Sequence, residues 1–157
     1  MAAVVKVILY QPQIPQNTGN IMRTCSVSGT ALALVPPFGF TVNDRWLKRS
    51  GLDYWKKAQI EIVEDLEKAL DKTKQTFYFF SSRVRKHYTQ LTFDTGSWLI
   101  FGSETTGLPE RFFQKWSDRF ASIPMLPQSR CLNLATSAGI VLYEALRQQD
   151  FRQLTKE

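Results

Sequence analysis

Histidine is almost missing from this sequence, since His87 is the single one among 157 residues. Cysteine is nearly as scarce, because Cys25 and Cys131 are the only two and lie far apart. A zinc site of the usual His/Cys type would have to gather these three residues and a carboxylate from the whole chain. A Ser-His-Asp hydrolase would have to use His87, which lies in the polar run "RVRKHYTQ". We therefore expect chemistry that needs neither a metal nor a histidine base.

Long apolar runs are lacking as well. The segment "MAAVVKVILY" has too short an apolar run and no cleavage-type end for a signal peptide, and nothing else approaches a membrane span. The two cysteines form no Cys-x-x-Cys pair. These absences predict a reduced, cytoplasmic protein without a membrane segment.

Acidic residues are outnumbered, because 20 Lys and Arg stand against 14 Asp and Glu and leave a net charge of +6. This balance favours a polyanionic partner such as RNA. Two basic stretches could contact phosphates, and their basic residues include Arg45, Lys48 and Arg49 in "RWLKRSGLDYWKK" (45–57) and Arg83, Arg85 and Lys86 in "RVRK" (83–86). Trp46, Tyr54 and Trp55 could stack exposed bases. The alternative is a solvated face with the tryptophans in the core.

Apolar and polar segments alternate along the chain in a strand and helix pattern. The expected strands are 4–10, 31–36, 60–63, 76–82, 97–102 and a short one in "FASIPM", and the expected helices are 17–29, 42–49, 64–72, one beginning at Pro109, and 132–148. Such alternation predicts an α/β fold with a mostly parallel sheet and helices on both faces. No repeat, linker or low-complexity tract interrupts it, so we expect one domain over 1–157.

A glycine-containing loop, "FGSETTGLP" (101–109), follows one of these strands. It is not a P-loop, because no Lys-Ser/Thr follows the second glycine, and the Gly-x-Gly-x-x-Gly dinucleotide fingerprint is absent. Gly102 would let a flat ligand lie against the backbone, and Gly107 would supply a positive φ. A Gly102→Val change is then expected to block the site while leaving the fold intact. The alternative is a turn that needs two glycines and no ligand.

Two further polar stretches stand at strand-to-helix connections. "NTGNIMR" (17–23) carries Asn17 and Asn20, with Arg23 expected one turn into a helix. In "IPMLPQSRCLNLATSAG" (123–139), Asn133 stands just before the last helix. Each could be an ordinary helix N-terminus. Since ligands bind beyond the carboxyl ends of parallel strands, three such loops together indicate a binding site.

Together these stretches resemble the three motifs of the SPOUT superfamily of RNA methyltransferases, and "LKRSGLDYW" (47–55) is most similar to its TrmL type. The resemblance covers nearly the whole chain. It implies a C-terminal trefoil knot, which alternation alone would not suggest because knots are rare. It also implies methyl transfer from S-adenosylmethionine to the ribose 2′-hydroxyl of the wobble nucleotide, position 34, cytidine or uridine, in a tRNA anticodon stem-loop.

Carried over by position, the resemblance assigns cofactor contacts to Phe80, Gly102, Ile123 and Cys131. The family usually has serine where this chain has Cys131. A contact through the backbone would survive that change, whereas a hydroxyl hydrogen bond would be weakened because a thiol is a poor donor.

The resemblance gives Arg23 the central catalytic role, with Asn17, Glu104 and Asn133 orienting the substrate or Arg23. A guanidinium keeps its proton, so clamping a phosphate and stabilising charge on the 2′-oxygen is easier for Arg23 than acting as a base. Glu104 could instead form only a loop salt bridge. The rival functions are 2′-O-methylation at another tRNA or rRNA site, and a catalytically silent RNA-binding module.

The last helix carries two apolar stripes, one more than a surface helix needs to face its own core. The first contains Leu134, Ala138, Val141 and Ala145, and the second contains Ala135, Gly139, Leu142 and Leu146. The second stripe predicts a homodimer through this helix, in line with the dimeric state that the resemblance implies. The alternative is a helix buried wholly within one subunit.

Overall fold

The computed structural model describes residues 4–41 and 60–155, and its centre is a six-stranded sheet in the order β3-β2-β1-β5-β4-β6. The strands are β1 (Val5–Tyr10), β2 (Ala31–Val35), β3 (Ile60–Ile62), β4 (Phe77–Phe80), β5 (Ser97–Phe101) and β6 (Phe120–Ala121). Every pairing between them is parallel. The predicted α/β class with a parallel sheet is confirmed.

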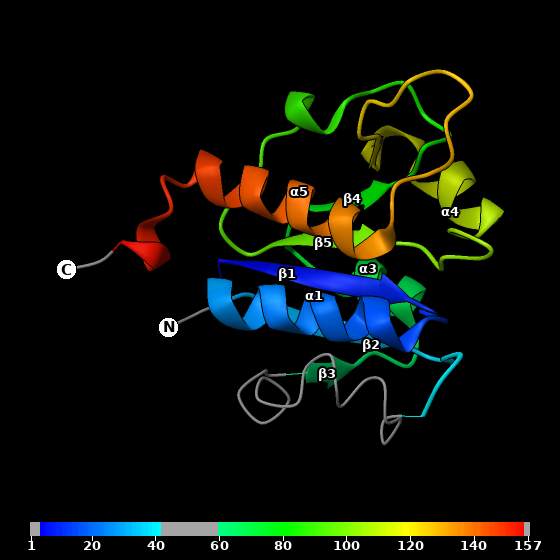
Figure 1. Cartoon of the computed structure of the whole chain (residues 1–157), viewed down its shortest axis with the longest axis horizontal. Coiled ribbons are helices and arrows are strands. Elements are labelled where there is room, and N and C mark those ends of the chain that lie inside the picture. The colour runs from blue at the N-terminus through cyan, green and yellow to red at the C-terminus, as the bar shows by residue number, and fades with distance from the viewer. Residues whose placement is uncertain (1–3, 42–59, 156–157) are drawn as a thin grey trace.

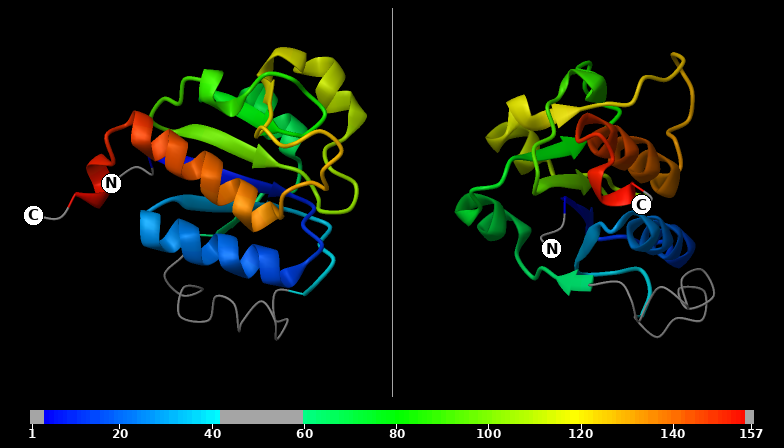
Figure 2. Two further views of the ribbon diagram at one scale, coloured as in Figure 1. Left: turned by 45° about the horizontal axis from the view of Figure 1, so that its top comes forward. Right: turned by 90° about the vertical axis from the view of Figure 1, so that its left-hand side faces the viewer.

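Helices cover both faces of the sheet (Figures 1 and 2). The helices are α1 (Pro15–Ser28), α3 (Leu66–Lys72), α4 (Glu110–Lys115) and α5 (Leu134–Gln148), with short 3-10 turns at Tyr88–Gln90, Ser117–Arg119 and Arg152–Leu154. Helices α1 and α5 lie side by side on one face, and α3 and α4 cover the other. Along β1, Val7 packs toward α1 and α5, whereas Ile8 packs toward α3 and α4, because successive strand side chains point to opposite faces. Burial on both faces explains the nearly continuous apolar strands.

The two long helices differ in how they begin. Helix α1 starts at Pro15, earlier than predicted, and its N-cap Ile14 offers no side-chain hydrogen bond. It ends at Gly29 with φ of 65°, which confirms the predicted end. Helix α5 begins after Asn133, whose side chain accepts from the backbone N–H groups of the first turn. The N-cap alternative for Asn133 is therefore correct.

The two apolar stripes of α5 are only partly separate. Leu142 and Leu146 of the second stripe are buried in the same core cluster as Val141 of the first. These two leucines therefore face their own core, whereas Ala135 and Gly139 of the same stripe are only half-buried, and the homodimer stays a prediction. The large apolar side chains exposed on this side of the fold include Val27 on α1 and Tyr143 on α5.

The predicted helix at 42–49 lies outside the described residues, and so do the predicted RNA contacts Arg45, Lys48 and Arg49.

Candidate functional site

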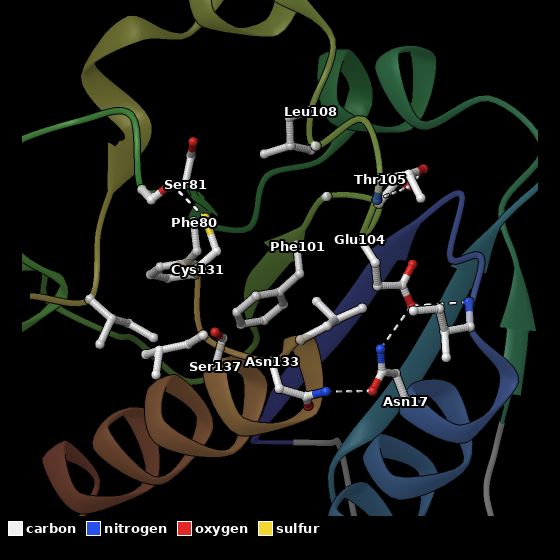
Figure 3. A pocket seen from close by; sticks show the side chains of 18 of the residues that line it. Asn17, Phe80, Ser81, Phe101, Glu104, Thr105, Leu108, Cys131, Asn133 and Ser137 are labelled. Carbon is white, nitrogen blue, oxygen red and sulfur yellow. Dashed lines mark hydrogen bonds between the residues drawn. The ribbon is translucent and has the colours of Figure 1, made fainter. Parts of the chain in front are cut away.

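A cavity of about 460 Å³ opens at the carboxyl ends of β4 and β5, where open α/β sheets bind ligands. Its volume is within the usual range for small-molecule sites. The walls come from the start of α1, the ends of β4 and β5 and the segment between β6 and α5 (Figure 3). The lining residues are Ile14, Asn17, Phe80, Ser81, Ser82, Phe101, Gly102, Ser103, Glu104, Thr105, Gly107, Leu108, Ile123, Met125, Cys131, Leu132, Asn133, Leu134 and Ser137. All of the predicted catalytic and cofactor residues except Arg23 are in this set.

The loop after β5 is closed by its own backbone. Ser103 and Gly107 exchange two backbone hydrogen bonds of 3.2 and 2.9 Å, and Gly107 has the predicted positive φ, at 66°. A Cβ placed on Gly102 would lie 2.5 Å from the carbonyl carbon of Gly107 and 2.7 Å from the nitrogen of Leu108. A side chain at Gly102 would force the backbone of the loop to shift, so we now expect Gly102→Val to disturb the loop as well as to block the site.

Glu104 of this loop serves the start of α1. Its carboxylate accepts hydrogen bonds from the backbone N–H of Gln13 at 2.7 Å and of Ile14 at 3.2 Å. These bonds hold the two residues that lead into the helix, whose N-cap Ile14 offers no side-chain hydrogen bond, and a negative charge at a helix N-terminus is favourable. The contacts of Glu104 with the described residues are hydrogen bonds, so the loop salt bridge considered as an alternative is not formed there.

Asn17 and Asn133 extend this contact into a chain of hydrogen bonds across the cavity (Figure 3). The Asn17 amide donates to Glu104 at 3.3 Å, and the Asn133 amide donates to the Asn17 oxygen at 2.9 Å. The Asn133 oxygen in turn accepts from the backbone N–H of Ala135 at 2.8 Å. The side chain of Asn17 is only 6% exposed, so its orientation is fixed by these partners. The chain joins the glycine loop to the N-termini of both α1 and α5.

The opposite wall is apolar and holds the predicted cofactor residues. Phe80 stacks on Phe101 with ring centroids 5.1 Å apart, and Ile123 packs against the same core cluster. Leu108 is a further apolar residue of the lining. Cys131 is exposed at this wall, and its Sγ lies 3.4 Å from the Oγ of Ser82. An apolar wall facing a row of amides and backbone groups suits a ligand with a flat ring at one end and polar groups at the other.

Arg23 does not lie where it was expected. Since α1 begins at Pro15, Arg23 is more than two turns into the helix, about 12 Å along its axis from the start. It is exposed and is not part of the cavity lining. The expectation that it lies one turn into the helix beside the cofactor loop is therefore wrong.

The basic residues that follow β4 differ in the contacts that they make. Arg83 forms an ion pair with Glu110 at 2.9 Å, and its guanidinium lies 4.1 Å from the ring centroid of Phe113. Arg85 and Lys86 are exposed and form no ion pair with any residue in 4–41 or 60–155. The two arginines are therefore not equivalent as phosphate contacts.

Sequence reasoning missed several lining residues, including Ser82, Met125 and Ser137. Ser137 stands one helical turn after Asn133, a spacing that places both near the same helix end. Within the described residues, no cluster of three or more His, Cys, Asp or Glu side chains could hold a metal ion. No helix in the same ranges is long and apolar enough to span a bilayer.

A parallel sheet with a ligand-sized cavity at its carboxyl edge, walled by a glycine loop and two helix N-termini, defines an α/β protein that binds a small organic ligand. The family model described as the SpoU rRNA methylase family matches residues 4–143. The chain belongs to this family. A relative from Methylovorus glucosotrophus, named tRNA (cytidine(34)-2′-O)-methyltransferase, is 43% identical over 148 residues, which are 92% of this chain and 96% of the relative.

Solved structures have the same fold. One, described as giving structural insights into the 2-OH methylation of C/U34 on tRNA, is 36% identical with a TM-score of 0.86 and covers 93% of this chain and 96% of its own. The SpoU methyltransferase AviRb of Streptomyces viridochromogenes, solved in complex with AdoMet, is 24% identical with a TM-score of 0.82 and covers 96% of this chain and 59% of its own. The likeness to AviRb concerns the fold alone.

Proposed function

We propose that this protein methylates the ribose 2′-hydroxyl of the wobble nucleotide, position 34, cytidine or uridine, in the anticodon stem-loop of a tRNA, with S-adenosylmethionine as the methyl donor. The observation that carries the proposal is the convergence of the three motif segments on one cavity. The names of the relatives that match nearly the whole chain support the same substrate.

The cavity fits the cofactor in size and in the chemistry of its walls. Phe80 and Ile123 form an apolar face for the adenine ring, and the backbone at Gly102 and Cys131 supplies polar groups at its edge. When bound, S-adenosylmethionine supplies an electrophilic methyl group on a positively charged sulfur, and its reactivity needs no metal and no covalent enzyme intermediate. The protein adds alignment, because a correctly held 2′-oxygen reacts far faster than one that diffuses freely.

The polar side of the cavity has a positioning role in this mechanism. Asn17 and Asn133 have their amides held by one another and by Glu104, so they present fixed polar groups to the cavity. Glu104 acts through α1, because its oxygens are occupied by backbone N–H groups. The three residues set the geometry in which the ribose meets the methyl group.

Arg23 is assigned to the RNA rather than to the cofactor, because it lies outside the cavity lining. A guanidinium stays protonated and can hold a phosphate with two parallel hydrogen bonds. Holding the phosphate beside the target ribose, with a positive charge near the reacting 2′-oxygen, lowers the barrier electrostatically. Arg85 and Lys86, together with Arg45, Lys48 and Arg49, provide the wider basic surface for the stem-loop. Arg83 adds to this surface, although a phosphate there has to compete with its exposed ion pair to Glu110.

We further propose that the working unit is a homodimer that packs through α1 and α5. Val27 and Tyr143 expose 55% and 41% of their surface on these neighbouring helices, and covering both would bury apolar area. Sedimentation velocity at micromolar concentration is expected to give a dimer, and Tyr143→Glu is expected to give a monomer. A wild-type monomer at that concentration refutes the assembly.

The chain architecture proposed with this function is a single domain over 1–157 with a C-terminal trefoil knot. The support for the knot is that the chain leaves β6 at one edge of the sheet and returns so that α5 packs against the central strands β1 and β5.

The direct test is nucleoside mass spectrometry of tRNA from cells with and without the protein. The 2′-O-methylated cytidine or uridine at position 34 is expected to vanish without it and to return with the wild-type gene. If the cells without the protein instead lose a ribose methyl from rRNA or from another tRNA position, that nucleotide is the target in place of the wobble nucleotide. The family description names rRNA. No change in any methylated nucleoside would favour the silent module.

A further inference from the structure

A second cavity, also of about 460 Å³, adjoins the first. It lies between the segment after β4 and the segment between β6 and α5. Four residues line both cavities: Ser82, Ile123, Met125 and Cys131. The contact of 3.4 Å between Ser82 Oγ and Cys131 Sγ is part of this common wall. A ligand in the second cavity would therefore be a close neighbour of whatever occupies the first.

The lining of the second cavity is suited to an anion. Arg85 and His87 supply its basic groups, and Ser82 and Ser129 supply hydroxyls. Among the described residues none of those that line it is acidic. A guanidinium flanked by hydroxyl donors is the usual protein environment of a phosphate. Pro124, Met125 and Leu126 add apolar surface on which a base could rest, and Leu126 is 80% exposed.

The segment that carries Arg85 is held in place before any ligand arrives. The backbone N–H of Ser122 donates to the Lys86 carbonyl at 2.7 Å, and the N–H of Tyr88 donates to the Ser122 carbonyl at 2.9 Å. The Ser122 hydroxyl donates to the same Lys86 carbonyl at 3.3 Å. These bonds continue the parallel pairing of β4 with β6, so the floor of the second cavity is an extension of the sheet. A preformed site loses less entropy on binding than a flexible surface does.

Arg83 provides an internal comparison. It is two residues from Arg85 and equally charged, but it lies outside the second cavity and is paired with Glu110. Arg85 lines the cavity and forms no ion pair with the described residues. A general basic surface would use the two arginines alike, whereas a discrete site uses Arg85 alone.

We propose that the second cavity is a nucleotide subsite, which holds the nucleotide adjacent to the methylated one and binds its phosphate through Arg85. This inference rests on the proposed function, because it places the target ribose at the first cavity. Because the two cavities share a wall, an RNA whose reacting ribose lies at the first cavity brings the adjacent nucleotide to the second cavity. Bases of single-stranded RNA loops are commonly splayed into separate pockets in this way. The site thereby fixes the register of the strand and selects which ribose meets the methyl group.

The test combines a protein change with an RNA change. Anticodon stem-loops are made with an uncharged methylphosphonate in place of one phosphate at a time on either side of the target nucleotide. Their dissociation constants are measured with wild-type protein, Arg85→Ala, Arg83→Ala and Lys86→Ala. Arg85→Ala is expected to weaken binding about tenfold, as for a charge-assisted hydrogen bond, and to lower the salt slope by about 0.7. One methylphosphonate is expected to weaken wild-type binding by a similar factor.

The decisive result comes from combining the protein variant with the modified RNA. If Arg85 binds that phosphate, the same methylphosphonate has almost no further effect on Arg85→Ala, whereas it keeps its full effect on Arg83→Ala and Lys86→Ala. Additive losses at every position, or equal losses for all three variants, overturn the subsite. Because the readout is binding, it does not depend on turnover. If wild-type protein binds and methylates the stem-loop but the losses from Arg85→Ala and the methylphosphonate are additive, the subsite alone is refuted. If the losses are coupled as expected but no methyl is transferred, the proposed reaction alone is refuted.

Discussion

Replacing Glu104 with glutamine separates positioning from chemistry at this site. The change keeps the size and shape of the side chain but removes its charge and one of its two acceptor oxygens. The backbone N–H groups of Gln13 and Ile14 then share a single neutral acceptor at the start of α1. The exposed variant Glu110→Gln is the matched control, because it also neutralises a glutamate, one that forms a single ion pair with Arg83.

The size of the effect follows from these contacts. A hydrogen bond to a charged group contributes about 1.5–3 kcal/mol and a neutral one about 0.5–1.5 kcal/mol, so each of the two bonds loses about 1 kcal/mol. With the weaker helix-dipole interaction, we expect Glu104→Gln to lower the free energy of unfolding by about 2 kcal/mol. In a protein of this length, that lowers the Tm by about 4–8 °C. Glu110→Gln is expected to cost less than about 1 kcal/mol, because exposed ion pairs contribute little.

Thermal unfolding, S-adenosylhomocysteine titration and single-turnover methyl transfer together decide between the two roles. If Glu104 acts by holding α1, the variant loses stability, and the rate is largely restored at low temperature with saturating cofactor. An unchanged Tm and normal cofactor affinity, with a rate reduced a hundredfold or more, would refute this reasoning and assign Glu104 to the reacting atoms.

Three further predictions concern single residues. Arg23→Ala is expected to leave cofactor affinity nearly unchanged and to slow single-turnover methyl transfer on the order of a hundredfold. Arg23→Lys is expected to restore little of the rate. A rate near wild type for Arg23→Ala would contradict the catalytic assignment of Arg23. Gly102→Ala is expected to lower both Tm and cofactor affinity, because its Cβ would meet the Gly107 backbone at 2.5 Å, and an unchanged Tm would contradict this. A maleimide at neutral pH is expected to label the exposed Cys131, and to label it more slowly when S-adenosylhomocysteine is bound. It is expected to spare Cys25, because burial raises the pKa of the Cys25 thiol to about 12 and keeps the thiol protonated. Rapid labelling of Cys25 in the native protein would refute this.

Local rules predicted the parts of the fold that depend on neighbours in sequence. The end of α1 at Gly29, the cap at Asn133 and the positive φ of Gly107 each follow from one residue type at one position. The parallel sheet followed from alternation, although its strand order did not, because pairing between distant strands leaves no local trace.

The failures have two physical causes. Helix α1 begins at Pro15, a residue type that favours the first helical position, so its early start had a local signal that the prediction did not use. The hydrogen bond from Gln13 to Glu104, 91 positions away, left no such local signal. The error in the helix start also misplaced Arg23. The second stripe of α5 shows the same limit of local patterns, since Leu142 and Leu146 are buried in a core cluster with residues of β1, β2 and α1 from the other half of the chain.

The cavity draws its wall from Ile14 near one end of the chain to Ser137 near the other. A growing chain therefore has no complete cofactor site until α5 has begun to emerge and dock, however well its first strands have paired. Cofactor binding consequently requires all the segments of the wall to be folded together, and it stabilises every part of the wall at once. At a concentration of 100 times the dissociation constant, a ligand that binds only this complete state adds about 2.7 kcal/mol to the free energy of unfolding. The supply of methyl donor would thus set how long the enzyme survives as well as how fast it works.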